Sequence, residues 1–364
     1  MPTNKGFVLA SRPKGEAKES DFRFFTKETA EPADGQVLVK NLWMSLDPYM
    51  RGRMDESKSY AASQQIDEVM IAGTAGEVVA SKNNNFAVGD KVVSNNGGWQ
   101  LYSLTDGKDL RKIDASNVPL QAFVGPLGMP GVTAWYGVNH IIAPKAGGTL
   151  VVSAAPGAVG TVVGQLAKAK GAHAVGIAGG REKCDFAVNE LGFDACVDHR
   201  SPTFKEDLAA ATPNGVDGLF ENVGGQPFRL VSHRLNDFAR VAICGLIASY
   251  EGAEKSSLDD LRLLLVELRV QHVVRDAGLL QADAQRRDER APHADEVLAR
   301  RLGPHRPRAD LEAAQHPAGM ALELDEPDVV LLHDHDVERH LAVRGFQALH
   351  VGAELLGVEG PGFH

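Results

Sequence analysis

The sequence predicts an α/β protein of two domains, in which a strand-rich domain precedes a doubly wound parallel sheet covered by helices. Three observations predict this fold class. Strand-like, turn-rich stretches fill residues 1–125, and from residue 126 onward strand and helix patterns alternate. In addition, the apolar run 149–153 passes through small residues directly into a stretch with helical spacing that ends at Gly171.

The first domain is predicted to span residues 1–125 and to be antiparallel or barrel-like. Apolar and β-branched residues gather in stretches bounded by Gly, Asn and Pro, a pattern typical of strands joined by turns. The clearest of these stretches lie at 36–46, 71–81 and 88–104. No helical pattern separates them, so neighbouring strands can pair directly through short connections.

The second domain is predicted to span residues 126–265 and to contain repeated βα units. Its predicted strands lie at 148–155, 172–180, 194–199, 216–225 and 239–249. The predicted helices lie between them, at 158–171, 181–192, 203–212 and 227–236. Such a succession indicates parallel strands in one sheet, with helices on its faces.

Residues 266–364 are predicted to form an irregular tail rather than a native domain. From residue 261 onward the chain contains no Lys, Asn, Ser, Thr, Ile, Tyr, Trp or Cys, yet it holds 12 Arg and 9 of the 13 His. Lys, Asn, Ile and Tyr have AT-rich codons, whereas Ala, Arg, Gly and Pro have GC-rich ones. We therefore hypothesise that the tail is translated from a GC-rich gene in a shifted reading frame, and that the shift begins near residues 265–272. Sequencing the gene across this region tests the hypothesis.

Length, charge and cysteine content limit the classes of protein. The 364 residues are 43% hydrophobic and 24% charged, which is typical of globular domains. A net charge of −10, without a Lys/Arg stripe, argues against nucleic acid as a partner. Three cysteines without CxxC spacing, no signal peptide and no membrane-length apolar run predict a soluble, cytoplasmic protein without a membrane partner.

The stretch 155–160 is predicted to bind the phosphates of a dinucleotide. Such a site needs a strand, a tight bend beside the pyrophosphate and a helix packed closely on the sheet, which glycines usually permit. Ala155 stands where the first glycine is usual, whereas Gly157 and Gly160 occupy the second and third positions. The N–H groups at the helix start would then face the phosphates. The alternative is an ordinary helix start.

The end of the next predicted strand favours NADP(H) over NAD(H) as the cofactor. An NAD site usually has an Asp or Glu about 20 residues after the turn, where it binds the ribose hydroxyls. Here Gly179 and Gly180 precede Arg181 and Lys183, without an acid at the strand end. Cations suit a 2′-phosphate, and His199 lies after the following strand. The alternative is that these are solvated charges at a helix end.

No catalytic metal is predicted. Catalytic zinc requires three protein ligands, typically with Cys or His at set places. Residues 1–139 contain neither Cys nor His, so the first domain lacks these ligands. The segment HDHDVERH at 333–340 looks like a metal cluster, but chance explains it in a tail so rich in His and Asp.

Seven motifs occur in order between residues 45 and 250: SLDPYMRGRM, GGWQ, LGMPGVTAWYG, AAPGAVGTVVGQLAKAKG, GIAGGREKC, FENVGG and ICGLIASY. Together they resemble the zinc-free medium-chain dehydrogenase/reductases, specifically the leukotriene hydroxydehydrogenase/prostaglandin reductase and alkenal double-bond reductase group. The resemblance covers about residues 5–265. It implies an N-terminal GroES-like β-barrel domain, a Rossmann domain and often a homodimer. The implied reaction is NADPH-dependent reduction of the carbon–carbon double bond of α,β-unsaturated aldehydes and ketones.

The resemblance also implies roles for individual residues. The pyrophosphate would be held by Gly157, Ala158, Val159 and Gly160, the 2′-phosphate by Lys183 and His199, and the ribose end by Asn222. The nicotinamide would be lined by Cys244, Gly245, Leu246, Ile247, Ala248, Ser249 and Tyr250. The family commonly has Tyr-Lys where this chain has His199-Arg200. After about residue 270 the family's sixth strand, dimer-edge strand and return segment have no counterpart, so the sixth-strand region is predicted to be lost or altered and dimerisation is in question.

Two tyrosines are the predicted catalytic residues. Hydride transfer to an enone needs a hydrogen-bond donor at the carbonyl oxygen, where negative charge develops. Tyr250 follows a predicted parallel strand, at the end where ligands bind, and Tyr49 would reach in from the first domain. The alternative is that both are ordinary tyrosines with surface hydroxyls. For Arg51, a structural ion pair is favoured over a cofactor contact.

Three functions are compatible with these features. The leading one is an alkene reductase that takes a small-molecule enone or enal as substrate. A quinone reductase would use the same fold and cofactor but needs no donor for an enolate. The altered tail also leaves open an inactive product that binds the nucleotide without turnover.

Overall fold

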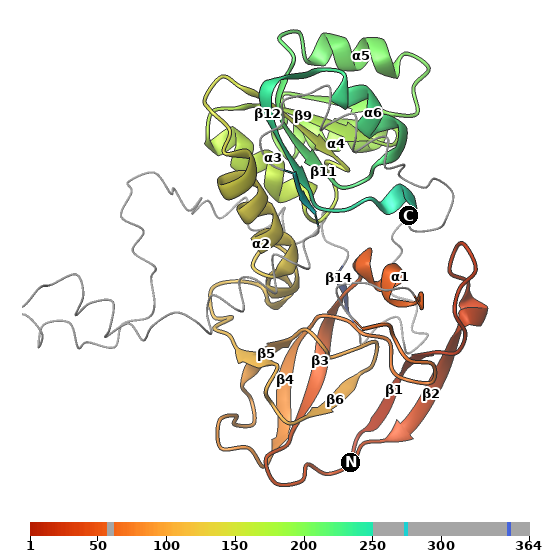
Figure 1. The fold of residues 1–364 in the computed structure, drawn as a ribbon. Helices are drawn as coiled ribbons and strands as arrows, with labels where there is room; N and C mark the ends of the chain where they lie inside the picture. Colours follow the sequence, from red (N-terminus) through yellow and green to blue (C-terminus); the bar gives the residue numbers. More distant parts are fainter. Residues whose placement is uncertain (57–61, 250–272, 276–347, 351–364) are drawn as a thin grey trace, which may run out of the picture.

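The computed structural model describes residues 1–56, 62–249, 273–275 and 348–350 (Figure 1). They form an antiparallel-sheet unit at the N-terminal end and a parallel-sheet unit with covering helices. Tyr250 and nearly all of the predicted tail lie outside the described residues. Within the described ranges, no helix combines the length and the apolar character needed to span a membrane.

The N-terminal unit is antiparallel, as predicted. Its strands are β1 (Thr3–Leu9), β2 (Phe22–Glu28), β3 (Val37–Ser45), β4 (Thr74–Ser81), β5 (Lys91–Ser94), β6 (Tyr102–Thr105) and β7 (Leu110–Lys112). Strands β1 and β2 pair with each other, and β3, β4, β5 and β7 pair in that order, with β6 against β3. Its helical turns are η1 (Glu19–Asp21), α1 (Tyr49–Arg53) and η2 (Leu120–Val124). A small apolar core, centred on Val37, Val39 and Val78, holds the sheet together.

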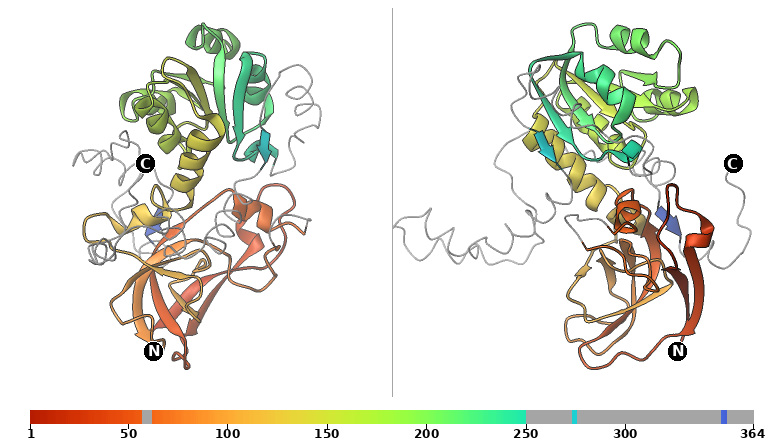
Figure 2. Two further views of the ribbon diagram at one scale, coloured as in Figure 1. Left: turned by 60° about the vertical axis from the view of Figure 1, so that its left-hand side comes forward. Right: turned by 45° about the vertical axis from the view of Figure 1, so that its right-hand side comes forward.

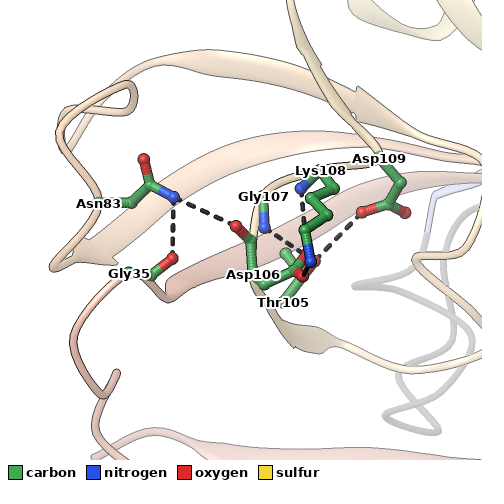
Figure 3. A network of polar contacts seen from close by, with 7 residues as sticks. All are labelled: Gly35, Asn83, Thr105, Asp106, Gly107, Lys108 and Asp109. Carbon is green, nitrogen blue, oxygen red and sulfur yellow. Dashed lines mark hydrogen bonds and ion pairs between the residues drawn. The ribbon is translucent and has the colours of Figure 1, made fainter.

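Polar side chains stabilise the turn that joins β6 to β7 (Figure 3). Thr105 Oγ1 donates to Asp109 Oδ1 at 3.1 Å, and Asn83 Nδ2 donates to the carbonyls of Gly35 and Asp106. A cavity of about 370 Å³ borders this turn and is lined by residues of 94–109. None of the residues predicted to bind cofactor or substrate lies in this cavity.

The second unit contains the predicted parallel sheet. Its strands are β8 (Thr149–Ser153), β9 (His173–Ala178), β10 (Ala195–Asp198), β11 (Val216–Glu221) and β12 (Leu235–Ile243), with β13 (Val273–Arg275) at the edge. Their order is β10-β9-β8-β11-β12-β13, and all five neighbouring pairs are parallel. The chain therefore reverses its direction of winding between β8 and β11, which makes their carboxyl ends the switch point where ligands bind in such sheets.

Helices cover both faces of this sheet, so the doubly wound prediction is confirmed (Figures 1 and 2). The helices are α2 (Met129–Tyr136), η3 (Gly137–Ile142), α3 (Gly160–Ala169), α4 (Arg181–Asn189), α5 (Phe204–Ala211) and α6 (Gly225–Ser232). Leu150 and Val152 of β8 pack in one core with α2, η3, α3 and α4, whereas Val151 packs in the other core with α5 and α6. Side chains alternate across a strand, so a fully buried β8 serves two cores.

Several predicted boundaries are wrong. The helix predicted at 227–236 begins at Gly225 and ends at Ser232. The strand predicted at 239–249 begins at Leu235 and ends at Ile243, and its predicted end forms the helical turn η4 (Ile247–Ser249). The positive φ angles of Gly224 and Gly225 turn the chain into the helix early. The pairing of Leu235 with Val216 starts the strand early, before an irregularity in that pairing. Helices α2 and η3, in 129–142, were not predicted.

Two short strands come from the predicted tail. Strand β13 pairs with β12 in parallel, with Val273 opposite Val241. Strand β14 (Ala348–His350) pairs with β3 antiparallel, with Leu349 opposite Met44. The prediction of a tail without regular structure is therefore incomplete, and the sixth position of the parallel sheet holds a strand of three residues. Strand pairing needs only an extended backbone beside a sheet edge, so even a segment of unusual composition can supply it.

Candidate functional site

The turn between β8 and α3 presents free backbone N–H groups at the switch point. Ala154 adopts a left-handed φ of 48°, and the N–H of Gly157 donates to its carbonyl at 2.9 Å. In the described part of the chain, no residue accepts a hydrogen bond from the N–H of Ala158, Val159 or Gly160. Three donors at a helix start, supported by the helix dipole, form a site for an anion.

Glycine is required at position 160, where helix and strand lie very close. A Cβ there would lie 2.8 Å from the carbonyl oxygen and 3.0 Å from the Cα of Ala155. At Gly157 a Cβ would lie 3.0 Å from the carbonyl oxygen of Ala154. Ala155 itself is fully buried and packs against Gly176. The chain bends at Ala154, through its left-handed φ angle. The next residue, Ala155, therefore does not need the conformational freedom of glycine.

The cationic residues predicted for the 2′-phosphate lie together beyond the ends of β9 and β10. Gly180, with φ of 100°, leads into α4, whose first turn carries the exposed Lys183. His199 Nε2 and Arg200 Nε both lie over Gly179, at 2.9 and 3.0 Å from where its Cβ would be. The structure thus places His199 over the Gly179–Gly180 turn, and Lys183 follows this turn in the first turn of α4. A lysine and a histidine beside one turn suit an anionic group.

Asp198 is a residue of this region that sequence reasoning missed. It ends β10, and its Oδ1 accepts hydrogen bonds from the N–H of Gly180 at 2.8 Å and of Arg200 at 2.9 Å. The hydrogen bond from Gly180 is the main cause that lowers the pKa of Asp198. An Asp at a strand end before a loop often accepts backbone N–H groups, and this signal could have identified it.

Two buried residues join the strands that flank the switch point. Ser153 Oγ donates to Glu221 Oε1 at 2.8 Å and accepts from the N–H of Asn222 at 2.7 Å. The same Oε1 accepts from the N–H of Val223 at 2.6 Å and of Gly224 at 2.8 Å. Burial raises the pKa of Glu221, and the bonds to its carboxyl group oppose this shift. Sequence reasoning missed both residues: Ser153 lies just before the glycine-containing motif, and Glu221 lies in FENVGG, where only Asn222 was assigned a role.

The residues predicted for the ribose and nicotinamide lie together next to this cluster. Asn222 Nδ2 donates to the carbonyl of Ser153 at 2.7 Å, and the Asn222 carbonyl accepts from the N–H of Ile247 at 3.3 Å. The N–H of Ala248 donates to Val223 at 2.9 Å. Turn η4 (Ile247–Ser249) continues this segment, and Cys244, Gly245, Leu246 and Ala248 are half-buried beside it. Tyr250, the main predicted catalytic residue, lies outside the described residues.

Tyr49 begins α1 on the N-terminal unit. Its ring is half-buried against Met44 and Met50, and in all views α1 lies on the side that faces the parallel-sheet unit (Figures 1 and 2). Arg51 forms an ion pair with Asp55 at 2.7 Å and donates to a backbone carbonyl of the same unit. These contacts agree with the structural role expected for Arg51.

Potential metal ligands do not cluster in the described residues: no group of three or more His, Cys, Asp and Glu side chains could hold an ion there. The predicted chance cluster at 333–340 lies outside the described residues. The turns at 155–160 and 179–180 instead fit a phosphorylated dinucleotide, because they combine close backbone approach, free N–H groups and nearby cations.

Two family models match the chain. One describes the N-terminal domain of oxidoreductases and matches residues 5–113. The other is described as a zinc-binding dehydrogenase and matches residues 158–286. Together they cover both units of the fold.

Relatives of known function are similar over most of the chain. NADPH-dependent curcumin reductase from Escherichia coli is 44% identical over 279 residues, which are 77% of this chain and 81% of that protein. NADP(+)-dependent 2-alkenal reductase from Nicotiana tabacum is 37% identical, over 73% of this chain and 79% of that protein. The crystal structure of CurA from Vibrio vulnificus in complex with NADPH matches with a TM-score of 0.69 and 42% identity, over 74% of this chain and 82% of that one.

A doubly wound sheet with an anion-binding turn at its switch point, preceded by an antiparallel-sheet unit, defines a two-domain oxidoreductase that uses a dinucleotide. The chain belongs to the zinc-free group of the medium-chain dehydrogenase/reductases. The comparisons thus confirm the predicted family, the enzyme class of NADP-dependent oxidoreductases and NADP(H) as the cofactor.

Proposed function

We propose that this protein reduces the carbon–carbon double bond of α,β-unsaturated aldehydes and ketones with NADPH. The observation that carries the proposal is that the free N–H groups at 158–160, Lys183 and His199 all follow the carboxyl ends of neighbouring parallel strands, β8, β9 and β10. The printed activities of the relatives, which include curcumin, 2-alkenal and (+)-pulegone reductases, support an enone or enal as the substrate class.

The residues that would hold the cofactor follow from this arrangement. The N–H groups of Ala158, Val159 and Gly160 would bind the pyrophosphate, Gly157 would permit its close approach, and Lys183 with His199 would bind the 2′-phosphate. Asn222 would lie at the ribose end. The nicotinamide would be lined by Cys244, Gly245, Leu246, Ile247, Ala248, Ser249 and Tyr250.

NADPH, when bound, supplies the hydride for the substrate β-carbon. The protein's own contribution is to orient the enone and to donate a hydrogen bond to its carbonyl oxygen as negative charge develops there. Tyr250 is the proposed donor, and Tyr49 approaches from the N-terminal unit. The α-carbon then receives a proton from a protein donor or from water.

We also propose the domain division and the assembly implied by the family. Residues 1–125 form a GroES-like domain that contributes to the substrate site, and 126–265 form the Rossmann domain. The family implies a homodimer, and the unusual composition of 266–364 puts dimerisation in question. The cysteine content favours a cytoplasmic location. Light scattering on the purified full chain tests the oligomeric state.

Turnover with matched substrates tests the proposed function. We expect NADPH oxidation with 4-hydroxynonenal to be faster than with a simple quinone at equal concentration, and the product to carry a saturated Cα–Cβ bond. Faster turnover of the quinone would favour a quinone reductase. If fluorescence shows NADPH binding but neither the enal nor the quinone is turned over, the chain is a catalytically inactive nucleotide-binding protein. The composition of the tail is the feature that raises this alternative.

A further inference from the structure

One buried glutamate forms hydrogen bonds with three segments beside the proposed cofactor site, through its carboxyl group and through its main chain. Glu221 ends β11 and is fully buried, with 0% of its surface exposed. Its Oε1 accepts from Ser153 Oγ at the end of β8 and from the N–H groups of Val223 and Gly224. Its main-chain carbonyl accepts from the N–H of Cys244 at 2.8 Å and of Gly245 at 3.2 Å.

The side-chain bonds determine the path of the turn after β11. The chain reverses direction at Gly224, where φ is 80°, so the carboxyl oxygen receives N–H groups that would otherwise continue the strand ladder. Leu246 packs directly on this turn, 3.2 Å from where a Cβ of Gly224 would lie. A shift of the turn would therefore also move the segment proposed to line the nicotinamide.

Only one of the two carboxyl oxygens has a partner. Oε2 is buried and forms no hydrogen bond with any described residue. A buried polar atom without a partner is costly, so its retention calls for an explanation beyond general stability. The partners of Oε1 lie directly beside the proposed cofactor contacts: Ser153 precedes the 155–160 turn, and Val223 and Gly224 follow Asn222. A role in positioning these contacts supplies that explanation.

We propose that Glu221 is a positioning residue, which holds the 222–224 turn and the 244–248 segment in the arrangement that binds NADPH. The inference rests on the proposed function of the site but concerns cofactor binding rather than the substrate. It requires the length of the side chain and one acceptor oxygen at Oε1, not the charge.

Two variants separate length from charge. Glu221→Gln keeps the length and an acceptor oxygen and loses the charge, whereas Glu221→Asp keeps the charge and withdraws the oxygen by one methylene. Thr212→Val is the matched control. Thr212 is also fully buried, and its hydroxyl bonds to Leu208 and Arg234. It lies before the amino end of β11, away from the proposed cofactor site. Each variant is compared with the full-length wild-type chain by NADPH fluorescence titration without substrate, by thermal unfolding, and by the split between KM for NADPH and kcat.

We expect the Kd for NADPH to rise at least about tenfold in Glu221→Asp, because two buried N–H groups lose their acceptor. In Glu221→Gln we expect recovery to within about threefold of wild type. Thr212→Val should lower the melting temperature without changing the Kd. Equal Kd values in Glu221→Asp and wild type would overturn the inference, as would an equal rise in Kd in Glu221→Gln or in Thr212→Val.

The result is independent of the substrate assignment. If the wild-type chain binds NADPH but reduces no enone, the proposed function fails while the comparison of Kd values still tests the role of Glu221. If the chain reduces enones and Glu221→Asp binds NADPH as wild type does, the positioning role fails alone. Should Glu221→Asp not fold, Glu221→Gln decides, since a Kd far above that of wild type contradicts the proposal.

Discussion

The carboxylate of Asp198 accepts a hydrogen bond of 2.8 Å from the N–H of Gly180, and so connects the end of β10 to the start of α4. The same oxygen accepts from the N–H of Arg200 at 2.9 Å. Both bonds lower the pKa of Asp198, so the carboxylate stays ionised at neutral pH. It thereby orders the turn that precedes Lys183, without lying in any recognised motif.

Removal of this carboxylate should weaken NADPH binding more than NADH binding. In Asp198→Ala the N–H of Gly180 loses its acceptor, and we expect KM for NADPH to rise about threefold to tenfold while KM for NADH changes little. Asp198→Asn retains an acceptor oxygen and should show a smaller effect. Steady-state kinetics with both coenzymes provide the measurement, and an identical rise for NADH would contradict the prediction.

Lys183 should determine the preference for the phosphorylated coenzyme. In Lys183→Ala the ratio of kcat/KM for NADPH to that for NADH should fall roughly tenfold to a hundredfold, since a hydrogen bond to a charged group is lost. Lys168→Ala is the control, because Lys168 pairs with Asp194 at 2.6 Å near the other end of α3. If both variants lower the ratio equally, the effect is one of net charge and not of this site.

Gly160 should tolerate no side chain. A Cβ would meet the backbone of Ala155, so Gly160→Ala should lower the free energy of unfolding by about 1–3 kcal/mol and weaken NADPH binding. Gly52→Ala is the matched control in α1, where a Cβ has nothing within 4 Å, and it should stabilise the protein by about 0.5–1 kcal/mol. Chemical denaturation and NADPH titration of both variants test this, and an unchanged Gly160→Ala would contradict it.

The raised pKa of Glu221 gives a prediction for stability against pH. The folded state holds this proton more tightly than the unfolded chain, so the free energy of unfolding falls as pH rises from the ordinary glutamate pKa through the raised one. Glu221→Gln lacks this titration. Its melting temperature relative to wild type should therefore increase as pH rises above 4.5, the ordinary glutamate value. A difference that stays constant over this range would contradict the prediction.

Removal of metal should leave the enzyme active. The chain lacks Cys and His in residues 1–139, so the N-terminal domain offers none of the usual ligands of catalytic zinc. Dialysis against EDTA should change neither the rate of NADPH-dependent reduction nor the melting temperature, and metal analysis should find far less than one zinc per chain. Loss of activity that zinc alone restores would overturn this expectation.

Several features of the fold could be predicted because they depend on local pattern. The apolar centre of β8, the small residues after it and the helical spacing of α3 indicated a dinucleotide turn. The alternation of patterns after residue 126 indicated the parallel sheet. The boundary between α6 and β12 could not be predicted from local pattern. It depends on the pairing of Leu235 with Val216 and on two glycines with positive φ, which local periodicity does not report.

The sequence by itself determined the class of fold, the family and the preference for NADP(H), since strand–helix alternation, the glycine spacing and the cations after β9 are all properties of short stretches. Only the tertiary structure decided that Ser153, Glu221 and Gly224 form one buried cluster, and that Asp198 supports the start of α4. Those contacts join residues of different strands. Their geometry exists only after the sheet has brought the strand ends together and removed water from between them.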